Sequence, residues 1–219
     1  MLAAILFDLD GTLANTDSIH FAVWQDILTR FDLEIDRNFY RERISGRTNA
    51  KIIQDILPQL SLQEAWHLAI EKEEVYRQLA GTLQPMPGLQ KVLAFTEANR
   101  IKQAVVTNAP RDNAVYMLKS LRLNDVFPLV ILAEDAPPGK PDPAPYKLGL
   151  TRLGVNSKDA IAFEDTAAGI SSAVAAGIYT IGVASTHSPE HLTLAGASLV
   201  IDDFKSEKLW ELLDKKMFY

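Results

Sequence analysis

Two aspartates, Asp8 and Asp10, follow an apolar run near the start of the chain, and Gly11 comes directly after them. The run covers residues 2–7 and is typical of a strand buried on both faces. Because residues two apart on a strand point the same way, both carboxylates are expected to face one pocket at the carboxyl end of a sheet. Two close negative charges repel each other, so the pair needs a reason to exist. A bound Mg²⁺ is one reason, and a division of labour between a nucleophile and a proton donor is another. The alternative is a polar junction between strand and turn.

Two further polar clusters follow expected strands or turns. Thr107 and Asn108 come after the apolar residues 101–106, and a hydroxyl at that place suits a phosphate oxygen. The alternative is that they cap the next helix. Lys140 lies among prolines that fix the backbone around it. Its ammonium would offset the charges of a carboxylate and a phosphate, whereas the alternative is a solvated surface charge.

A last cluster, Glu164 and Asp165, follows the apolar residues 160–163 and precedes small residues. Adjacent acids at the end of a buried strand are candidate metal ligands, and the alternative is a helix N-terminus where acids favour the dipole. Taken together, the clusters place carboxylates, a hydroxyl and an ammonium at one edge of one sheet. The sequence therefore predicts a site for Mg²⁺ and phosphate.

The spacing of apolar residues predicts an α/β fold with a Rossmann-like parallel sheet core and an inserted all-helical cap domain. After the first strand come helix-like stretches at 18–31, 39–44, 49–57 and 62–79. Strands are then expected at 101–106, 129–132, 160–163, 179–183 and 199–201, with helices at 89–98, 113–121, 144–153, 168–176 and 206–215. We therefore expect a catalytic core of residues 1–14 and 84–219, and a cap of residues 15–83 that opens and closes over the site.

The composition restricts the class of protein. The 219 residues carry a net charge of -6, with 47% hydrophobic and 23% charged residues, as in ordinary globular proteins. An acidic chain without basic clusters disfavours binding to nucleic acid or to an anionic membrane. There is no cysteine, which excludes disulfides and thiolate chemistry, and no segment approaches the roughly 18 apolar residues of a membrane span. We expect a cytoplasmic protein, acting as a monomer.

The clusters, in this order, resemble the motifs of the haloacid dehalogenase-like hydrolase superfamily, and the resemblance covers essentially the whole chain. The stretch 15–21 with Trp24 is similar to the sugar-phosphate phosphatases and the β-phosphoglucomutases of that superfamily. The stretches 44–47 and 107–111 look closer to broad-range sugar-phosphate phosphatases of plants and cyanobacteria. Many relatives carry Asp where this chain has Asn15. The dehalogenating branch lacks the second aspartate, so Asp10 argues against dehalogenation.

The resemblance implies a role for each cluster. Asp8 would be the nucleophile that takes the phosphoryl group, Asp10 the general acid and base, and Lys140 the bridge between nucleophile and phosphate. The implied phosphate-binding residues are Gly11, Thr107, Asn108 and Lys140. The implied ligands of Mg²⁺ are Asp8, Asp165 with Glu164 beside it, and the backbone carbonyl of Asp10.

Within the cap, His20 and Arg47 are candidate substrate contacts, with solvated surface positions as the alternatives. Lys51 is a third candidate for such a contact. Trp24 and Trp66 are expected in the core of the cap rather than against a sugar. Because the pKa of a free aspartate is about 3.9, we expect cap closure and hydrogen bonding to raise the pKa of Asp10 in the substrate complex.

The sequence therefore predicts a Mg²⁺-dependent phosphatase that hydrolyses small phosphorylated metabolites, foremost sugar phosphates, through an aspartyl-phosphate intermediate. The alternative is a β-phosphoglucomutase, an isomerase that shares every core residue and differs in whether a sugar hydroxyl or water attacks the phospho-enzyme. A third hypothesis is a sensor that binds a phosphometabolite without catalysis, for which Asp10 would be superfluous.

Overall fold

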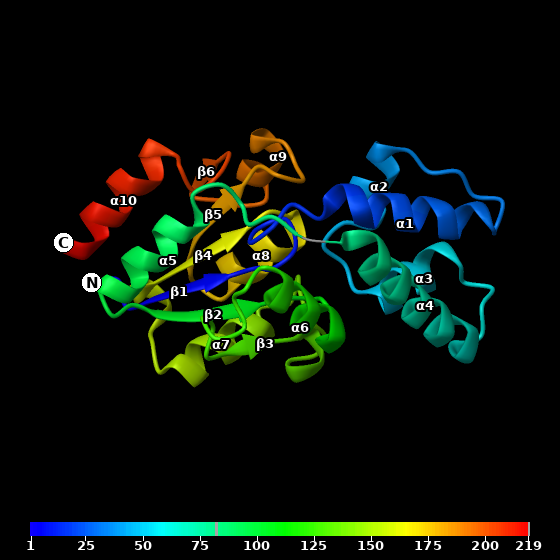
Figure 1. Ribbon diagram of the computed structural model, residues 1–219, viewed down its shortest axis with the longest axis horizontal. Helices are drawn as coiled ribbons and strands as arrows, with labels where there is room; N and C mark the ends of the chain where they lie inside the picture. The colour runs from blue at the N-terminus through cyan, green and yellow to red at the C-terminus, as the bar shows by residue number, and fades with distance from the viewer. Residues whose placement is uncertain (82, 219) are drawn as a thin grey trace.

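The computed structural model describes residues 1–81 and 83–218. Within that part of the chain, six strands form one sheet in which all neighbours run parallel. The strands are β1 (Ala4–Phe7), β2 (Lys102–Val106), β3 (Val130–Ile131), β4 (Ala160–Glu164), β5 (Tyr179–Val183) and β6 (Leu199–Ile201). Their order is β3-β2-β1-β4-β5-β6, with β1 and β4 at the centre. The α/β class and the parallel core are as the sequence predicts (Figure 1).

Helices cover both faces of this sheet, and the alternation of side chains along the strands explains how. Ile5 and Phe7 of β1 point to a large apolar cluster, whereas Ala4 and Leu6 point to a smaller one on the other face. The large cluster includes residues of α5 (Leu89–Ala98), α6 (Arg111–Ser120) and α10 (Glu207–Phe218). The smaller cluster includes residues of α7 (Ala144–Leu153) and α8 (Ala167–Ala175). Because both faces are covered, the central strand β1 is a continuous apolar run.

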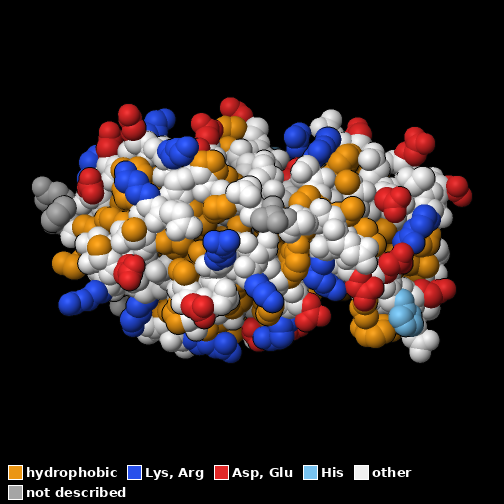
Figure 2. All heavy atoms as spheres, viewed as in Figure 1, with side chains coloured by type: hydrophobic (Ala, Val, Ile, Leu, Met, Phe, Trp, Pro, Cys, Tyr) orange, Lys and Arg blue, Asp and Glu red, His pale blue; other side chains and the backbone are white. Residues whose placement is uncertain are grey.

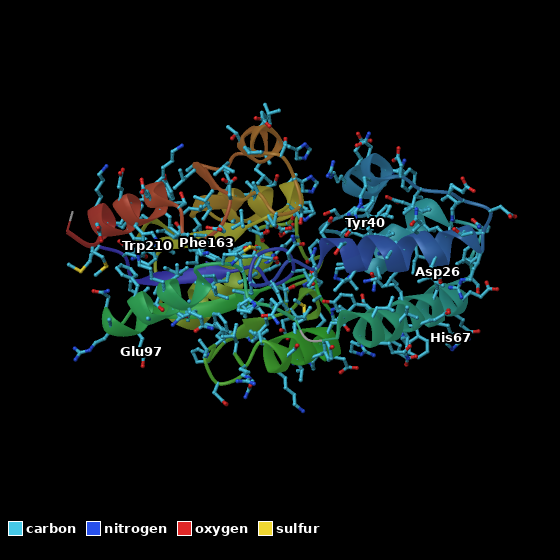
Figure 3. All side chains as sticks on the ribbon, turned by 45° about the horizontal axis from the view of Figure 1, so that its top comes forward. Asp26, Tyr40, His67, Glu97, Phe163 and Trp210 are labelled. Atoms are coloured by element: carbon cyan, nitrogen blue, oxygen red, sulfur yellow. The ribbon has the colours of Figure 1, made fainter. Side chains whose placement is uncertain are left out.

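Aromatic rings fill the centre of the large cluster. Phe7 and Phe163 lie side by side on β1 and β4 and stack at 5.3 Å between ring centroids. Phe204 meets Phe163 edge-on at 5.0 Å, and Trp210 of α10 donates a hydrogen bond to the carbonyl of Phe204 at 3.0 Å. Figure 3 labels Phe163 and Trp210. The same register brings Asp8 and Glu164, the residues that follow Phe7 and Phe163, to the same edge of the sheet.

Four helices between β1 and α5 form a separate lobe, on the right in Figure 1 and opposite the two termini. They are α1 (Asp17–Thr29), α2 (Arg37–Arg43), α3 (Asn49–Ile56) and α4 (Leu62–Ala80). Both α1 and α3 pack against α4. Ser61 and Glu64 form the capping box that starts α4. The helical insertion is as expected, and its limits at 15 and 83 remain a prediction.

The structure differs from the expected elements mainly at their ends. β1 begins at Ala4 rather than Leu2, and β3 has only two residues because pairing with β2 covers no more of that run. The helix α9 (Pro189–Leu194) and the 3-10 helices η1 (Ala133–Asp135) and η2 (Ser157–Asp159) were not predicted. Each is too short to show a helical period, although the Ser188 cap before α9 is a local signal.

The surface carries both signs of charge. On the face shown in Figure 2, acidic and basic side chains are interspersed over both lobes. Over the described residues, no helix combines the length and the apolar character that a bilayer span requires.

Candidate active site

The predicted site residues meet at the carboxyl edge of the sheet. The chain passes from β1 through β2 to β3 on one side and returns with β4 on the other side of β1. The carboxyl ends of the neighbouring strands β1 and β4 therefore form a topological switch point, the place where open α/β sheets bind ligands. A cavity of about 520 Å³ opens here between the sheet edge and the helical lobe. Asp8, Asp10, Thr107, Lys140 and Asp165 all line it.

Lys140 joins the ends of the two central strands. Its ammonium donates to Asp8 Oδ1 at 2.6 Å and to Glu164 Oε1 at 2.5 Å. Tyr146 of α7 also donates to Glu164 Oε1, at 2.6 Å. Lys140 is only 3% exposed, so the alternative of a solvated surface charge is wrong. An ammonium held between two buried carboxylates is a fixed positive charge beside the Asp8 oxygen.

Burial shifts the pKa values of these groups. It raises the pKa of Asp8 from 3.8 to about 8, with Glu164 adding to the effect and Lys140 opposing it. Burial likewise raises the pKa of Asp165 well above its ordinary value, and the charges of Asp8 and Glu164 add to that. For Lys140, burial lowers the pKa, but the charges of Asp8 and Glu164 outweigh it and the pKa is raised. The site thus concentrates negative charge that a further cation would relieve.

The raised pKa of Asp8 has a consequence for stability. A carboxyl whose folded pKa exceeds its unfolded pKa stabilises the fold below the unfolded value and loses this contribution as pH rises through the folded value. For Asp8 this window extends from 3.8 to about 8. We expect the increase in melting temperature that Mg²⁺ produces over EDTA to grow between about pH 5 and pH 8, because the metal then relieves an ionised Asp8. Thermal unfolding with either additive measures it, and an increment independent of pH would contradict the expectation.

The acidic groups fit a hard divalent cation. Asp8, Glu164 and Asp165 each offer an oxygen, and these oxygens lie within 4.8 Å of one another. Among the described residues, Asp165 Oδ1 is buried without a hydrogen-bond partner. Buried carboxylate oxygens without donors are suitable ligands for Mg²⁺, which prefers oxygen. Glu164 Oε1 is bonded to Lys140 and Tyr146, whereas Glu164 Oε2 is, over the described residues, buried without a partner like Asp165 Oδ1. The Asp10 side chain lies outside this cluster.

Gly11 leaves room for the Asp165 carboxylate. Its φ is +76°, and a Cβ there would lie 2.0 Å from Asp165 Oδ2. We expect Gly11→Ala to displace that carboxylate and to weaken Mg²⁺ binding by at least about 10-fold in calorimetric titration. Gly154→Ala is the matched control, because Gly154 also has positive φ, at +63°, and its nearest neighbour would be 3.9 Å away. Equal Mg²⁺ affinity in both variants would contradict this role of Gly11.

The two residues after β2 differ in what they do. Thr107 is buried at the cavity, where Oγ1 accepts from the amide of Ala109 at 3.0 Å. Asn108 is bonded twice to the backbone of Lys140, at 3.0 and 3.2 Å, and once to the carbonyl of Gly46 at 3.0 Å. The cap of α6 is Pro110, so the alternative of a helix-capping pair is wrong. The Asn108 amide holds the Lys140 segment and the helical lobe together.

The two acids at the end of β4 likewise do not cap a helix. The cap of α8 is Thr166, whose hydroxyl accepts from the amide of Gly169 at 3.2 Å. Asp165 directly precedes that cap, as the alternative of acids at a helix N-terminus expects, whereas Glu164 is the last residue of β4, and both are buried. Glu164 has Lys140 and Tyr146 as its partners, and Asp165 has Thr186.

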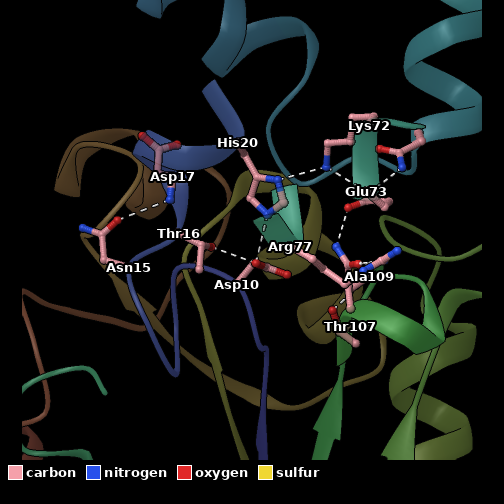
Figure 4. Close-up of polar contacts among 12 residues, drawn as sticks. Asp10, Asn15, Thr16, Asp17, His20, Lys72, Glu73, Arg77, Thr107 and Ala109 are labelled. Atoms are coloured by element: carbon pink, nitrogen blue, oxygen red, sulfur yellow. Dashed lines mark hydrogen bonds and ion pairs between the residues drawn. The ribbon is translucent and has the colours of Figure 1, made fainter. Parts of the chain in front are cut away.

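Asp10 lies apart from the acidic cluster and contacts the first helix of the lobe. Its Oδ1 accepts from Thr16 at 2.8 Å and lies 3.0 Å from His20 Nε2 (Figure 4). Burial raises the pKa of Asp10, but the hydrogen bond and charge of His20, with Thr16 and Lys72, outweigh it and the pKa is lowered. This shift is opposite to the one expected for the substrate complex. His20 is thus a partner of Asp10 rather than a solvated residue.

The structure shows the surroundings of the other residues considered in the cap, two of them basic and two of them tryptophans. Arg47 lines the cavity, but its guanidinium is bonded to Asp55 and to the carbonyl of Arg43. Lys51 donates to the carbonyl of Pro138 at 3.3 Å and so links the lobe to the core. Trp24 is buried as predicted. The prediction for Trp66 is wrong, because its side chain is 62% exposed at the cavity.

Sequence reasoning missed a polar network in the cavity wall. Lys72 Nζ donates to Glu73 Oε1 and lies 2.9 Å from His20 Nδ1. The other ring nitrogen of His20, Nε2, contacts Asp10, so the network extends from Glu73 to Asp10. Glu73 in turn bonds Asn49 and Asn113. In sequence, Lys72 and Glu73 are two charges among many on α4, and only the packing of α1 and α3 on that helix buries them.

The matches to known proteins extend over both lobes. A family model described as haloacid dehalogenase-like hydrolase matches residues 5–183. The phosphorylated carbohydrates phosphatase of Thermotoga maritima is 29% identical over 219 residues, covering 97% of this chain and 98% of its own. The structure of β-phosphoglucomutase from Clostridium difficile has a TM-score of 0.88 at 26% identity, covering 99% and 98% of the two chains. The structure of CbbY from Rhodobacter sphaeroides in complex with xylulose-(1,5)bisphosphate has a TM-score of 0.82 at 26% identity, covering 93% and 95%.

Proposed function

We propose that this chain, which belongs to the haloacid dehalogenase-like hydrolase family, is a Mg²⁺-dependent phosphatase of small phosphorylated metabolites, foremost sugar phosphates. The observation that carries the proposal is the contact between Lys140 and Asp8 beside the Asp165 carboxylate, with Asp10 lining the same cavity. A nucleophile, a fixed positive charge, a cluster of carboxylates that can hold a metal ion and a separate acid–base group are the parts that phosphoryl transfer through a covalent intermediate requires. The matched phosphatase acts, by its name, on phosphorylated carbohydrates.

In the first step, an Asp8 oxygen attacks phosphorus, and the bond between phosphorus and the leaving sugar oxygen breaks. Asp10 gives its proton to that oxygen. The dianionic phosphate next to Asp10 raises the pKa of Asp10 from its lowered value, so that it carries this proton in the complex. Lys140 stabilises the charge that builds up on the phosphoryl oxygens.

In the second step, water attacks the phosphorus of the aspartyl phosphate and the bond to the Asp8 oxygen breaks. Asp10 accepts the proton of that water and so returns to its initial state for the next turnover. The lowered pKa of Asp10 beside His20 suits this role as a base. Inorganic phosphate leaves, and Asp8 is regenerated.

Asp8 and Asp165 would hold the metal, and Glu164 would anchor Lys140 next to it. When bound, Mg²⁺ neutralises phosphoryl charge and orients a phosphate oxygen. Thr107 lines the cavity at the end of β2, and its hydroxyl would bind the phosphate. Monomeric state and a cytoplasmic location remain predictions from the sequence.

A panel of phosphometabolites, assayed for phosphate release with Mg²⁺ and with EDTA, tests this function. We expect turnover of p-nitrophenyl phosphate and of several sugar phosphates with Mg²⁺, at least about 100-fold above the rate with EDTA. Adding excess Mg²⁺ to the chelated enzyme should restore the rate. Turnover that is indifferent to EDTA, or the absence of turnover across the panel, would contradict the proposal.

A second candidate function is that of a β-phosphoglucomutase, because a structure of that enzyme superposes along nearly the whole chain. The two reactions share the aspartyl phosphate and differ in its acceptor. Incubation with β-glucose 1-phosphate separates them: a mutase yields glucose 6-phosphate and a phosphatase yields inorganic phosphate.

A further inference from the structure

Glu73 is a buried carboxylate in the part of the cavity wall that the helical lobe forms. It projects from α4 and is 6% exposed. Its Oε1 accepts from Lys72 Nζ at 2.9 Å and from Asn49 Nδ2 at 2.5 Å, and its Oε2 accepts from Asn113 Nδ2 (Figure 4). The reaction proposed above gives Glu73 no part.

The donors around Glu73 come from both lobes. Asn113 is on α6 of the core, whereas Asn49 is on α3 and Lys72 on α4. Arg77, one turn after Glu73 on α4, donates to Asn113 Oδ1 at 2.6 Å and also lines the cavity. An ammonium and two amides thus converge on one place, and a guanidinium holds one of those amides; such groups bind phosphate or carboxylate in proteins. Glu73 fills that place with an anion of the chain itself.

We propose that Glu73 determines substrate specificity: it occupies the donors of Lys72, Asn49 and Asn113 in the cavity wall, so that the cavity takes monophosphates with an uncharged distal end and rejects a second phosphate. This inference rests on the proposed function and names the substrate class of the same site. Lys72 and Arg77 carry two positive charges, and Glu73 cancels one of them while occupying three donors. A second phosphate arriving there meets a carboxylate that is already bonded.

Glu73 stays ionised in this position. Burial raises its pKa, but the charge of Lys72, the charge of His20 and the bonds from Lys72 and Asn49 outweigh burial and lower it. A buried carboxylate that keeps its charge repels a phosphate dianion, and like charges brought together in a desolvated site are costly.

The same charge bears on the choice between phosphatase and mutase. Transfer to a sugar hydroxyl would break the bond between phosphorus and Asp8, form a new bond to the sugar oxygen and pass the hydroxyl proton to Asp10. The product is a sugar bisphosphate, and to return its other phosphate to Asp8 it must place the first one elsewhere in the cavity. Glu73 opposes that placement, and water, which is neutral, meets no such barrier.

Binding in the Asp8→Asn background tests the inference without turnover. Glucose 6-phosphate and glucose 1,6-bisphosphate are titrated by calorimetry, with Mg²⁺ present, into this parent and into the parent with Glu73→Gln. We expect the parent to bind the monophosphate at least about 10-fold more tightly. Glu73→Gln should reduce that preference at least about 10-fold, because it removes the charge and keeps the shape. Glu74→Gln, an exposed neighbour on α4, should leave the preference unchanged.

A parent that binds the bisphosphate as tightly as the monophosphate, or that binds neither sugar, overturns the inference, and no Glu73 variant is needed for that result. A preference that Glu73→Gln leaves intact also overturns it. Melting temperatures identify a misfolded Glu73→Gln protein, in which case Glu73→Ala takes its place, with the same expected loss of preference. The proposed function fails by a different observation, the lack of phosphate release by the unmodified enzyme.

Discussion

Phosphate release should fall by at least about 10⁴-fold when Asp8 is replaced by asparagine, since an amide cannot take the phosphoryl group. The fold should persist, because asparagine has the same shape and the site loses one of its repelling charges. Lys140 keeps Glu164 as a partner at 2.5 Å. Steady-state rates with p-nitrophenyl phosphate and Mg²⁺ measure the loss, and thermal unfolding measures the stability.

Asp26→Asn is the matched control for this change. Asp26 is an exposed residue of α1 that does not line the cavity, and its replacement should leave the rate within about 2-fold. An Asp8→Asn enzyme that keeps a hundredth or more of the parental rate would show that another group attacks phosphorus.

Lys140→Met is expected to reduce both activity and stability. The variant leaves Asp8 and Glu164 buried without their shared cation, and breaking such a buried pair costs about 3–5 kcal/mol of unfolding free energy. Without Lys140, the pKa of Asp8 rises further, because the charge of Lys140 is the main influence that lowers it. We therefore expect the rate to fall by at least about 100-fold and its acid limb to move to higher pH.

The pH profile separates a chemical role of Lys140 from a purely structural one. Lys147→Met, on the exposed side of α7, should change neither the rate nor the profile. A Lys140→Met enzyme that is destabilised but retains the parental rate and acid limb would restrict Lys140 to packing.

The sheet and its order of elements could be predicted from the sequence because parallel strands must be apolar throughout. Residues 160–163 and 179–183 gave clear runs of this kind, and their observed bounds differ by one residue at most. Short elements such as β3 and α9 have too few residues to show a period, so their limits depend on tertiary pairing.

The sites at strand ends were also predictable, since the edge of a parallel sheet brings the ends of β1, β2 and β4 together whatever the loops do. The polar residues that the lobe contributes to the cavity wall could not be predicted. They come from three helices whose packing the sequence does not specify, so Lys72 and Glu73 were interpreted as ordinary surface charges. The prediction for Trp66 was wrong for the converse reason. An aromatic side chain on a helix is usually buried, and this one is exposed at the cavity.

The most direct test of the account is to isolate the covalent intermediate. The enzyme is mixed with Mg²⁺ and a reactive phosphoryl donor such as acetyl phosphate, quenched in acid within milliseconds and analysed by peptide mass spectrometry. The account predicts the mass of one added phosphoryl group on the peptide that contains Asp8, removed by hydroxylamine and absent from Asp8→Asn. Phosphate release without a phosphorylated peptide, or a phosphoryl group on another residue, would contradict it.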